Sequence, residues 1–162
     1  MPHPFDRTIA VIHYLLTKQR FAVGDGLVDL RRMLWYLDVS ASVELGSRLT
    51  AFDYIKREDG PAPGHFAWVI GRMQSLGALG GGAADYLAYR TASLNPIRLA
   101  DMTGFSDRQI AIIDRCFAIV SAAGYGGGRL SADAEAEKIV SQTPNGERLA
   151  LPDRPQPLSA LR

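Results

Sequence analysis

The sequence predicts a mainly α-helical fold with a small antiparallel β-ribbon, in a single compact helical domain. The chain has 162 residues, of which 47% are hydrophobic and 22% charged, which suits one globular domain with its own core. Several segments repeat apolar residues every three or four positions, a spacing typical of amphipathic helices. Between them, residues 49–55 are rich in residues that favour a strand.

Two helices are predicted in the first forty residues. The first spans residues 5–20, and its apolar stripe comprises Phe5, Ile9, Ile12 and Leu16. The second spans residues 25–39, and its stripe comprises Leu27, Leu30, Leu34 and Leu37. Met33, Trp35 and Tyr36 widen that stripe. We therefore expect the second helix to be buried on more than one face.

The ribbon is predicted in the middle of the chain. Residues 40–48 are small and polar and are expected to connect the second helix to a strand at residues 49–55. Residues 56–64 contain two prolines and two glycines, which predicts a turn or loop. Residues 85–92 are the predicted second strand. Because a lone ribbon is marginal in water, it must pack on the helices.

Three more helices are predicted in the rest of the chain. One spans residues 65–75, and Gly77, two residues beyond it, fits a C-terminal cap. The next follows a capping box in which Ser106 caps and Gln109 reaches back. A weaker helix runs from about residue 130 to residue 141. The helical domain is accordingly assigned to residues 1–141, and residues 142–162 to an extended or partly disordered tail.

Composition and charge argue against several classes of protein. The formal net charge is +1, whereas nucleic-acid binders usually carry a clear basic excess. The single cysteine, Cys116, rules out an internal disulfide and is expected to be buried. The N-terminus does not have the pattern of a signal peptide, and no apolar run approaches the ~18 residues of a membrane span. A cytoplasmic location is expected.

No catalytic, cofactor or metal motif is recognised. The triple glycines at residues 80–82 and 126–128 lack the lysine of a phosphate-binding loop. His3, His13 and His65 are not at metal-ligand spacing, and the carboxylates are scattered. We therefore expect no enzyme, no cofactor and no metal. An enzyme of unrecognised type would instead need a pocket with a perturbed pair of titratable groups.

A winged-helix-like, nucleic-acid-binding regulator is the alternative interpretation. It follows from the order helix, helix, strand, turn, strand, with Arg31, Arg32, Lys56 and Arg57 placed to contact phosphates. The apolar character of the second helix argues against it, because a recognition helix must be exposed.

Trp68 lies off the apolar stripe of its helix, and we expect it to be partly exposed. A solvent-facing Trp68 beside His65 and Tyr54 forms a candidate binding patch, since tryptophan and tyrosine are enriched in interface hot spots. The alternative is that these residues only widen the core.

The stretch from Leu30 to Leu79 resembles the Panacea (SocA-like) antitoxin family. The matching elements are the run Leu30 to Asp38, then Gly46, Leu49-Thr50, Tyr54, Gly60-Pro61-Ala62-Pro63, Leu76-Gly77 and Leu79, and later Phe105-Ser106 to Ile113-Asp114 and Gly146 to Leu149. The chain departs from the family in the segment Leu130-Ser131-Ala132-Asp133-Ala134, where many members have Leu-Ser-x-x-His. This sequence has Ala134 where those members have the histidine, so the histidine's role in the family is not carried over to this chain.

The resemblance implies a non-enzymatic protein-binding module. Members of the family are antitoxins that neutralise toxins by direct binding, and a SocA-like member is an adaptor that delivers a toxin to a protease. The expected partner is a cognate toxin, with a protease or chaperone as a further partner, and neither a membrane nor nucleic acid is expected. The predicted partner-binding residues are Trp35, Asp38, Tyr54, Pro61, His65 and Trp68.

Overall fold

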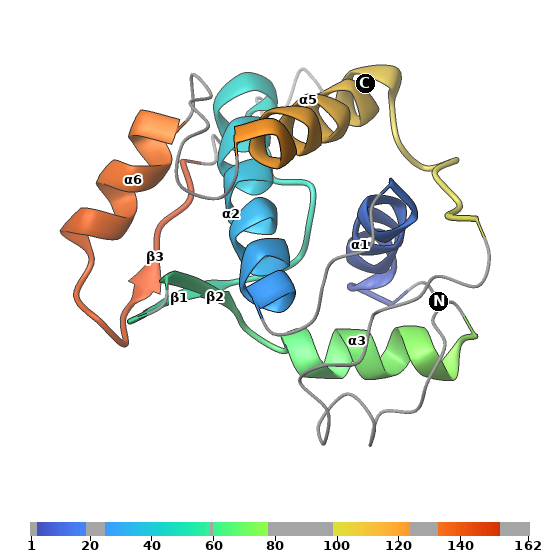
Figure 1. Ribbon diagram of the computed structural model, residues 1–162, viewed down its shortest axis with the longest axis horizontal. Helices are drawn as coiled ribbons and strands as arrows, with labels where there is room; N and C mark the ends of the chain where they lie inside the picture. The colour runs from blue at the N-terminus through green and yellow to red at the C-terminus, as the bar shows by residue number, and fades with distance from the viewer. Residues whose placement is uncertain (1–2, 19–24, 59, 78–98, 124–132, 153–162) are drawn as a thin grey trace, which may run out of the picture.

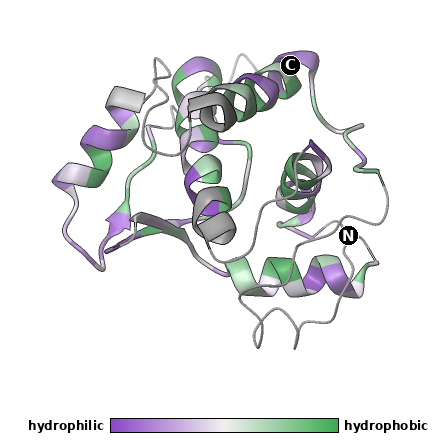
Figure 2. Cartoon of the chain, in the orientation of Figure 1, coloured by the Kyte–Doolittle hydropathy of each residue, from purple (hydrophilic) through white to green (hydrophobic). Residues whose placement is uncertain are grey.

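The computed structural model describes residues 3–18, 25–58, 60–77, 99–123 and 133–152. This part of the chain contains five helices and one three-stranded antiparallel sheet, which confirms the predicted mainly α fold (Figure 1). None of its helices is long and apolar enough to cross a membrane. Figure 2 shows apolar and polar residues interspersed along the helices, as expected where one face of each helix packs on a core.

Helix α1 spans Asp6–Lys18, close to the predicted range. Its fully buried side chains include Val11, Ile12 and Leu15, and they pack in the same core cluster as residues of the other elements. His13 is also buried, as expected for a packed histidine.

Helix α2 spans Asp25–Leu45 and is longer than predicted, because residues 40–45 continue it instead of forming a connection. The small side chains of Ser40, Ala41 and Ser42 are buried, and α2 packs closely on α5 (Asp107–Ala123). The Cys116 thiol of α5 lies 3.6 Å from the Ser40 hydroxyl. Small residues let two helices approach each other, so a run that is polar in sequence is interior in the fold.

The sheet differs from the predicted ribbon. Strand β1, Tyr54–Arg57, pairs with β2, Gly60–Pro63, in a register that places Arg57 opposite Gly60. The segment predicted as a turn is therefore itself a tight hairpin, made possible by the positive φ of 117° at Gly60. The predicted partner strand at residues 85–92 lies outside the described residues.

The third strand comes from the segment predicted as a tail. Helix α6 spans Asp133–Gln142, and β3, Arg148–Leu149, then pairs with the other side of β1. Leu149 is buried in the core cluster, so the assignment of the tail from residue 142 is wrong for these residues. The pairing is a contact across more than ninety residues of sequence, which local pattern does not reveal.

Helix α3 spans Phe66–Ser75 and follows β2 directly. His65, which precedes it, adopts a left-handed conformation with a φ of 63° and makes no side-chain cap hydrogen bond. At the other end, the Gly77 N–H donates to the Gln74 carbonyl over 3.1 Å, with a φ of 71° at Gly77. The predicted glycine cap is thus confirmed.

The capping box before α5 is also confirmed. The Gln109 N–H donates to the Ser106 hydroxyl over 3.1 Å, and the Ser106 N–H donates to the Gln109 side-chain carbonyl over 2.9 Å. We expect Ser106→Ala to lower the free energy of unfolding by about 1 kcal/mol, because the Gln109 N–H then loses its partner. Urea unfolding will measure this, with Ser141→Ala, an exposed serine inside α6, as the control. Equal losses in both variants would contradict the prediction.

Candidate functional site

The Asp38 carboxylate is fully buried and accepts four hydrogen bonds. Its Oδ1 accepts from the backbone N–H of Leu49 over 2.9 Å and from that of Thr50 over 3.0 Å. Its Oδ2 accepts from the Thr50 hydroxyl and from the Tyr54 hydroxyl, the latter over 2.6 Å. The carboxylate thus ties the middle of α2 to the chain that leads from α2 into β1.

The electrostatics of this cluster follow from its burial. Burial raises the pKa of Asp38 above its usual value of 3.8, although hydrogen bonds from Thr50, Tyr54 and Leu49 counteract part of the rise. Burial, and then the nearby Asp38 carboxylate, raise the pKa of Tyr54 well above 10.0. Tyr54 therefore stays protonated, and its hydroxyl donates a hydrogen bond to Asp38.

Asp38 and Tyr54 cannot contact a partner, contrary to the sequence prediction, because neither side chain has any solvent exposure. The Tyr54 ring packs edge-on against Trp35, with ring centroids 5.1 Å apart. These residues therefore stabilise the fold and do not form a binding surface. An aspartate that closes an aromatic run can be read as a surface feature from sequence, whereas the fold turns it inward to satisfy a buried turn.

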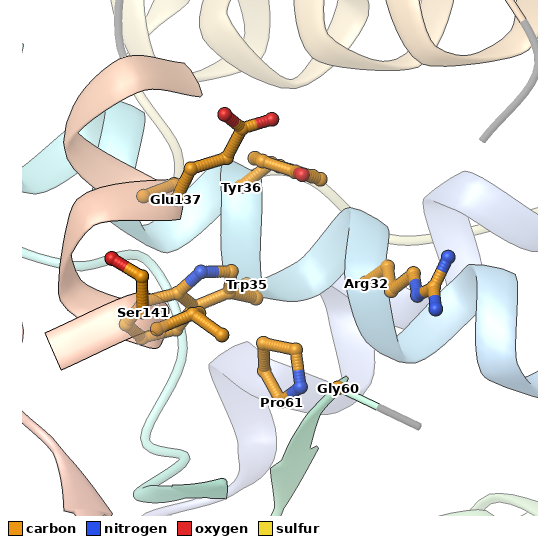
Figure 3. Close-up of a pocket in the computed structure, with 9 residues that line it drawn as sticks. Arg32, Trp35, Tyr36, Gly60, Pro61, Glu137 and Ser141 are labelled. Atoms are coloured by element: carbon orange, nitrogen blue, oxygen red, sulfur yellow. The ribbon is translucent and has the colours of Figure 1, made fainter. Parts of the chain in front are cut away.

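Two other predicted site residues, Trp35 and Pro61, meet at a pocket of about 250 Å³ between α2, β2 and α6. Figure 3 shows the pocket with the Trp35 ring between Pro61 and the Glu137 side chain. The complete lining is Arg32, Trp35, Tyr36, Gly60, Pro61, Ala136, Glu137, Val140 and Ser141. The contribution of α6 was missed in the sequence, because nothing local places residues 136–141 against Trp35.

The remaining predicted residues, His65 and Trp68, belong to an exposed cluster of rings. The Trp68 side chain is 46% exposed, which confirms the expected partial exposure. It stacks on His3 with ring centroids 5.0 Å apart, and Phe5 lies 5.7 Å from Trp68 and 6.2 Å from His65. We call His3, Phe5, His65 and Trp68 the aromatic patch.

Tyr54 is not part of the aromatic patch, although the sequence analysis placed it there. The Phe52 ring separates Tyr54 from the aromatic patch. Its centroid lies 5.8 Å from that of Phe5 and 6.2 Å from that of Tyr54. His3 and Phe5 were missed as patch residues, since Phe5 was assigned to a helical stripe. In the structure Phe5 precedes α1, and its carbonyl accepts a hydrogen bond from the Ile9 N–H. Its ring lies beside the Trp68 ring of α3, with the centroids 5.7 Å apart.

A second, wider cleft of about 610 Å³ adjoins the aromatic patch. Its lining comprises Pro4, Phe5, Ala51, Asp53, Ile55, Gly64, His65, Gly146 and Arg148. Asp53 forms ion pairs with Arg148 at 2.7 Å and with Arg48 at 3.5 Å, so the cleft has a polar wall. Phe5 and His65 are shared by the cleft and the patch. The surface near the N-terminus therefore combines exposed rings with a hollow.

A further ionic cluster joins α1 to α5 on the surface. Asp114 accepts hydrogen bonds from Lys18 and from the Tyr14 hydroxyl, each over 2.7 Å. Burial works against the charge of Asp114, but the bonds from Lys18 and Tyr14 outweigh it and lower the pKa of Asp114. The bond to Asp114 likewise raises the pKa of Lys18. This arrangement holds α1 and α5 together. Its residues line neither the pocket at Trp35 nor the wider cleft.

Within the described ranges, no group of three histidine, cysteine, aspartate or glutamate side chains is arranged to hold a metal ion. Cys116 is fully buried, as predicted. The strongest perturbed pair, Asp38 with Tyr54, is sealed in the core and opens to neither cleft. The pocket, the cleft and the aromatic patch lie at the surface. Together they are suited to contact with another molecule.

Comparison of the chain with protein-family models, with curated proteins and with solved structures finds no match.

Proposed function

We propose that this chain is a protein-binding module that acts as an antitoxin without catalysing a reaction. It neutralises a toxin by direct contact or acts as an adaptor that brings the toxin to a protease. Two observations support this role. One is the exposed aromatic patch of the described fold, and the other is the resemblance of residues 30–79 to the Panacea family.

The observation that carries the proposal is the exposure of Trp68. A half-exposed tryptophan that stacks on a histidine and lies beside a phenylalanine keeps a large apolar area in contact with water. Aromatic residues are enriched in the centres of protein interfaces, where they contribute most of the binding energy. A second, polar element lies next to it, because the cleft with the Asp53–Arg148 ion pair shares Phe5 and His65 with the patch.

The nucleic-acid alternative receives no support from the described residues. The side chains of α2 that are described are almost all buried or half-buried, so this helix does not offer a face for the major groove. Lys56 and Arg57 lie in a short hairpin whose strand β2 packs on α2. A gel shift titrated against salt tests the alternative, since phosphate contacts weaken steeply with salt.

Co-expression tests the proposal directly. The product of the adjacent gene is induced alone and together with this chain, and growth is followed. We expect the neighbour to arrest growth alone and this chain to restore it. Toxin abundance in a protease-deficient strain then separates masking from delivery to a protease. The antitoxin role fails if the neighbour is harmless alone, or if growth is not restored although both proteins are present.

A further inference from the structure

The pocket between α2, β2 and α6 contains a buried hydrogen-bond donor without a partner. The Trp35 side chain is only 1% exposed, and its indole nitrogen makes no hydrogen bond within the described structure. In Figure 3 this nitrogen lies on the edge of the ring toward Glu137 and Ser141, away from Pro61. An unsatisfied buried donor is costly and uncommon in native folds. The donor therefore points to a bound group that supplies an acceptor.

The walls of the pocket define what that group is. Trp35, Tyr36 and Pro61 provide flat ring surfaces, and Ala136 and Val140 close the pocket from α6. The volume of about 250 Å³ lies below the roughly 300–1,000 Å³ of sites that enclose a whole drug-sized ligand. The pocket therefore fits a small apolar part of a longer molecule, with a carbonyl directed to Trp35.

The neighbouring strand limits how a polypeptide can bind here. Among the strands that the structure describes, β2 lies at the edge of the sheet and pairs with β1 alone, and Pro61 and Pro63 lack a backbone N–H. A partner therefore cannot extend the sheet along β2 with a regular set of hydrogen bonds. A polyproline II segment has no such requirement, because it carries free carbonyls and presents its rings to aromatic walls.

We propose that this pocket binds a proline-containing extended segment of the partner, with the Trp35 indole N–H donating to a backbone carbonyl of that segment. A proline ring then packs between Tyr36, Pro61 and α6. This proposal rests on the proposed antitoxin function and names the chemical feature that the chain recognises in its partner. The competing occupant is the chain's own C-terminal sequence, which contains Pro155 and Pro157.

Nuclear magnetic resonance of the indole groups provides a direct test. The chain contains two tryptophans, so its spectrum has two indole N–H signals, and Trp68→Phe assigns the signal of Trp35. The probe is an acetylated and amidated heptapeptide of proline, with a glycine–serine heptapeptide as the control. We expect the Trp35 signal to move downfield as the proline peptide is added, until the shift reaches a plateau. The glycine–serine peptide should not move it.

Two matched serine variants locate the binding site. Ser141 lines the pocket, and its hydroxyl donates to the Lys138 carbonyl over 3.0 Å. Ser75 is an exposed serine of α3 with an equivalent bond to the Gly71 carbonyl, also over 3.0 Å. Ser141→Leu fills the pocket and should weaken the proline peptide at least tenfold, whereas Ser75→Leu should leave its affinity within twofold of the original protein.

The proposal is overturned if the proline peptide does not move the Trp35 signal, or if Ser141→Leu binds it unchanged. It is overturned in favour of the chain's own segment if Pro155→Ala with Pro157→Ala shifts the Trp35 signal upfield in the absence of peptide. An upfield shift in Glu137→Ala without peptide overturns it as well, because Glu137 is then the acceptor. Growth rescue without peptide binding sinks this inference alone, and peptide binding without rescue sinks the antitoxin role alone.

Discussion

Replacement of Asp38 by alanine is expected to lower the free energy of unfolding by about 4 kcal/mol, since it leaves several buried donors without an acceptor. The backbone N–H groups of Leu49 and Thr50 and the Tyr54 hydroxyl all donate to this carboxylate. None of them can reach water, because Leu49, Thr50 and Tyr54 are buried. Urea unfolding followed by circular dichroism measures the loss, provided that the variant still folds.

Asp38→Asn is the control that separates shape from hydrogen bonding. Its carbonyl can still accept from the two backbone N–H groups, and the hydroxyls of Thr50 and Tyr54 can rotate to accept from its amide. We therefore expect a loss of about 1 to 2 kcal/mol, well below that of Asp38→Ala. Equal losses in the two variants would contradict this expectation, because Asp38→Asn keeps the volume of the side chain and the acceptor for the two backbone N–H groups.

The pH dependence of stability provides an independent check on Asp38. Burial raises the pKa of Asp38 in the folded state above the value of 3.8 expected for the unfolded chain. The folded state therefore binds the proton more tightly, and this contribution to stability is complete below pH 3.8 and is lost as the pH rises through the folded-state pKa. The stability of the original protein relative to Asp38→Asn should fall over that interval. A rise over the same interval would contradict the assigned direction.

Replacement of Trp68 by alanine is expected to weaken binding of the proposed toxin partner by at least 30-fold, which corresponds to about 2 kcal/mol. Trp68 presents the largest ring of the aromatic patch and is 46% exposed, so a partner that covers it removes a large apolar area from water. Isothermal titration calorimetry with the toxin identified by co-expression measures the change. The same variant should also fail to restore growth.

Leu76→Ala is the matched control for Trp68. Leu76 lies just after α3, is 43% exposed, and does not belong to the aromatic patch. Its loss should change the affinity by less than threefold. Because Trp68 also stacks on His3, unfolding of both variants has to be measured, and we expect each to lose about 1 kcal/mol or less. Unchanged affinity of Trp68→Ala would remove the aromatic patch from the interface.

The candidate site was only partly foreseeable from the sequence. The position of Trp68 off its apolar stripe predicted its exposure, because that argument depends on neighbours three and four residues away. His3 and Phe5 join Trp68 through contacts across more than sixty residues, for which the sequence carries no local signal. Asp38 was assigned to the wrong environment for the same reason, since its partners lie eleven to sixteen residues away.

By itself, the sequence determined the helical class, the end of α3 at Gly77, the start of α5 after Ser106, and the burial of Cys116. These features depend on apolar periodicity, a capping box and a glycine at a left-handed position, all of which act within one or two helical turns. Only the tertiary structure decided that α2 extends to Leu45, that residues 148–149 complete the sheet, and that Trp35 closes a pocket under α6. Those outcomes depend on which apolar surfaces meet in the folded chain, and the free energy of that choice is shared among residues far apart in sequence.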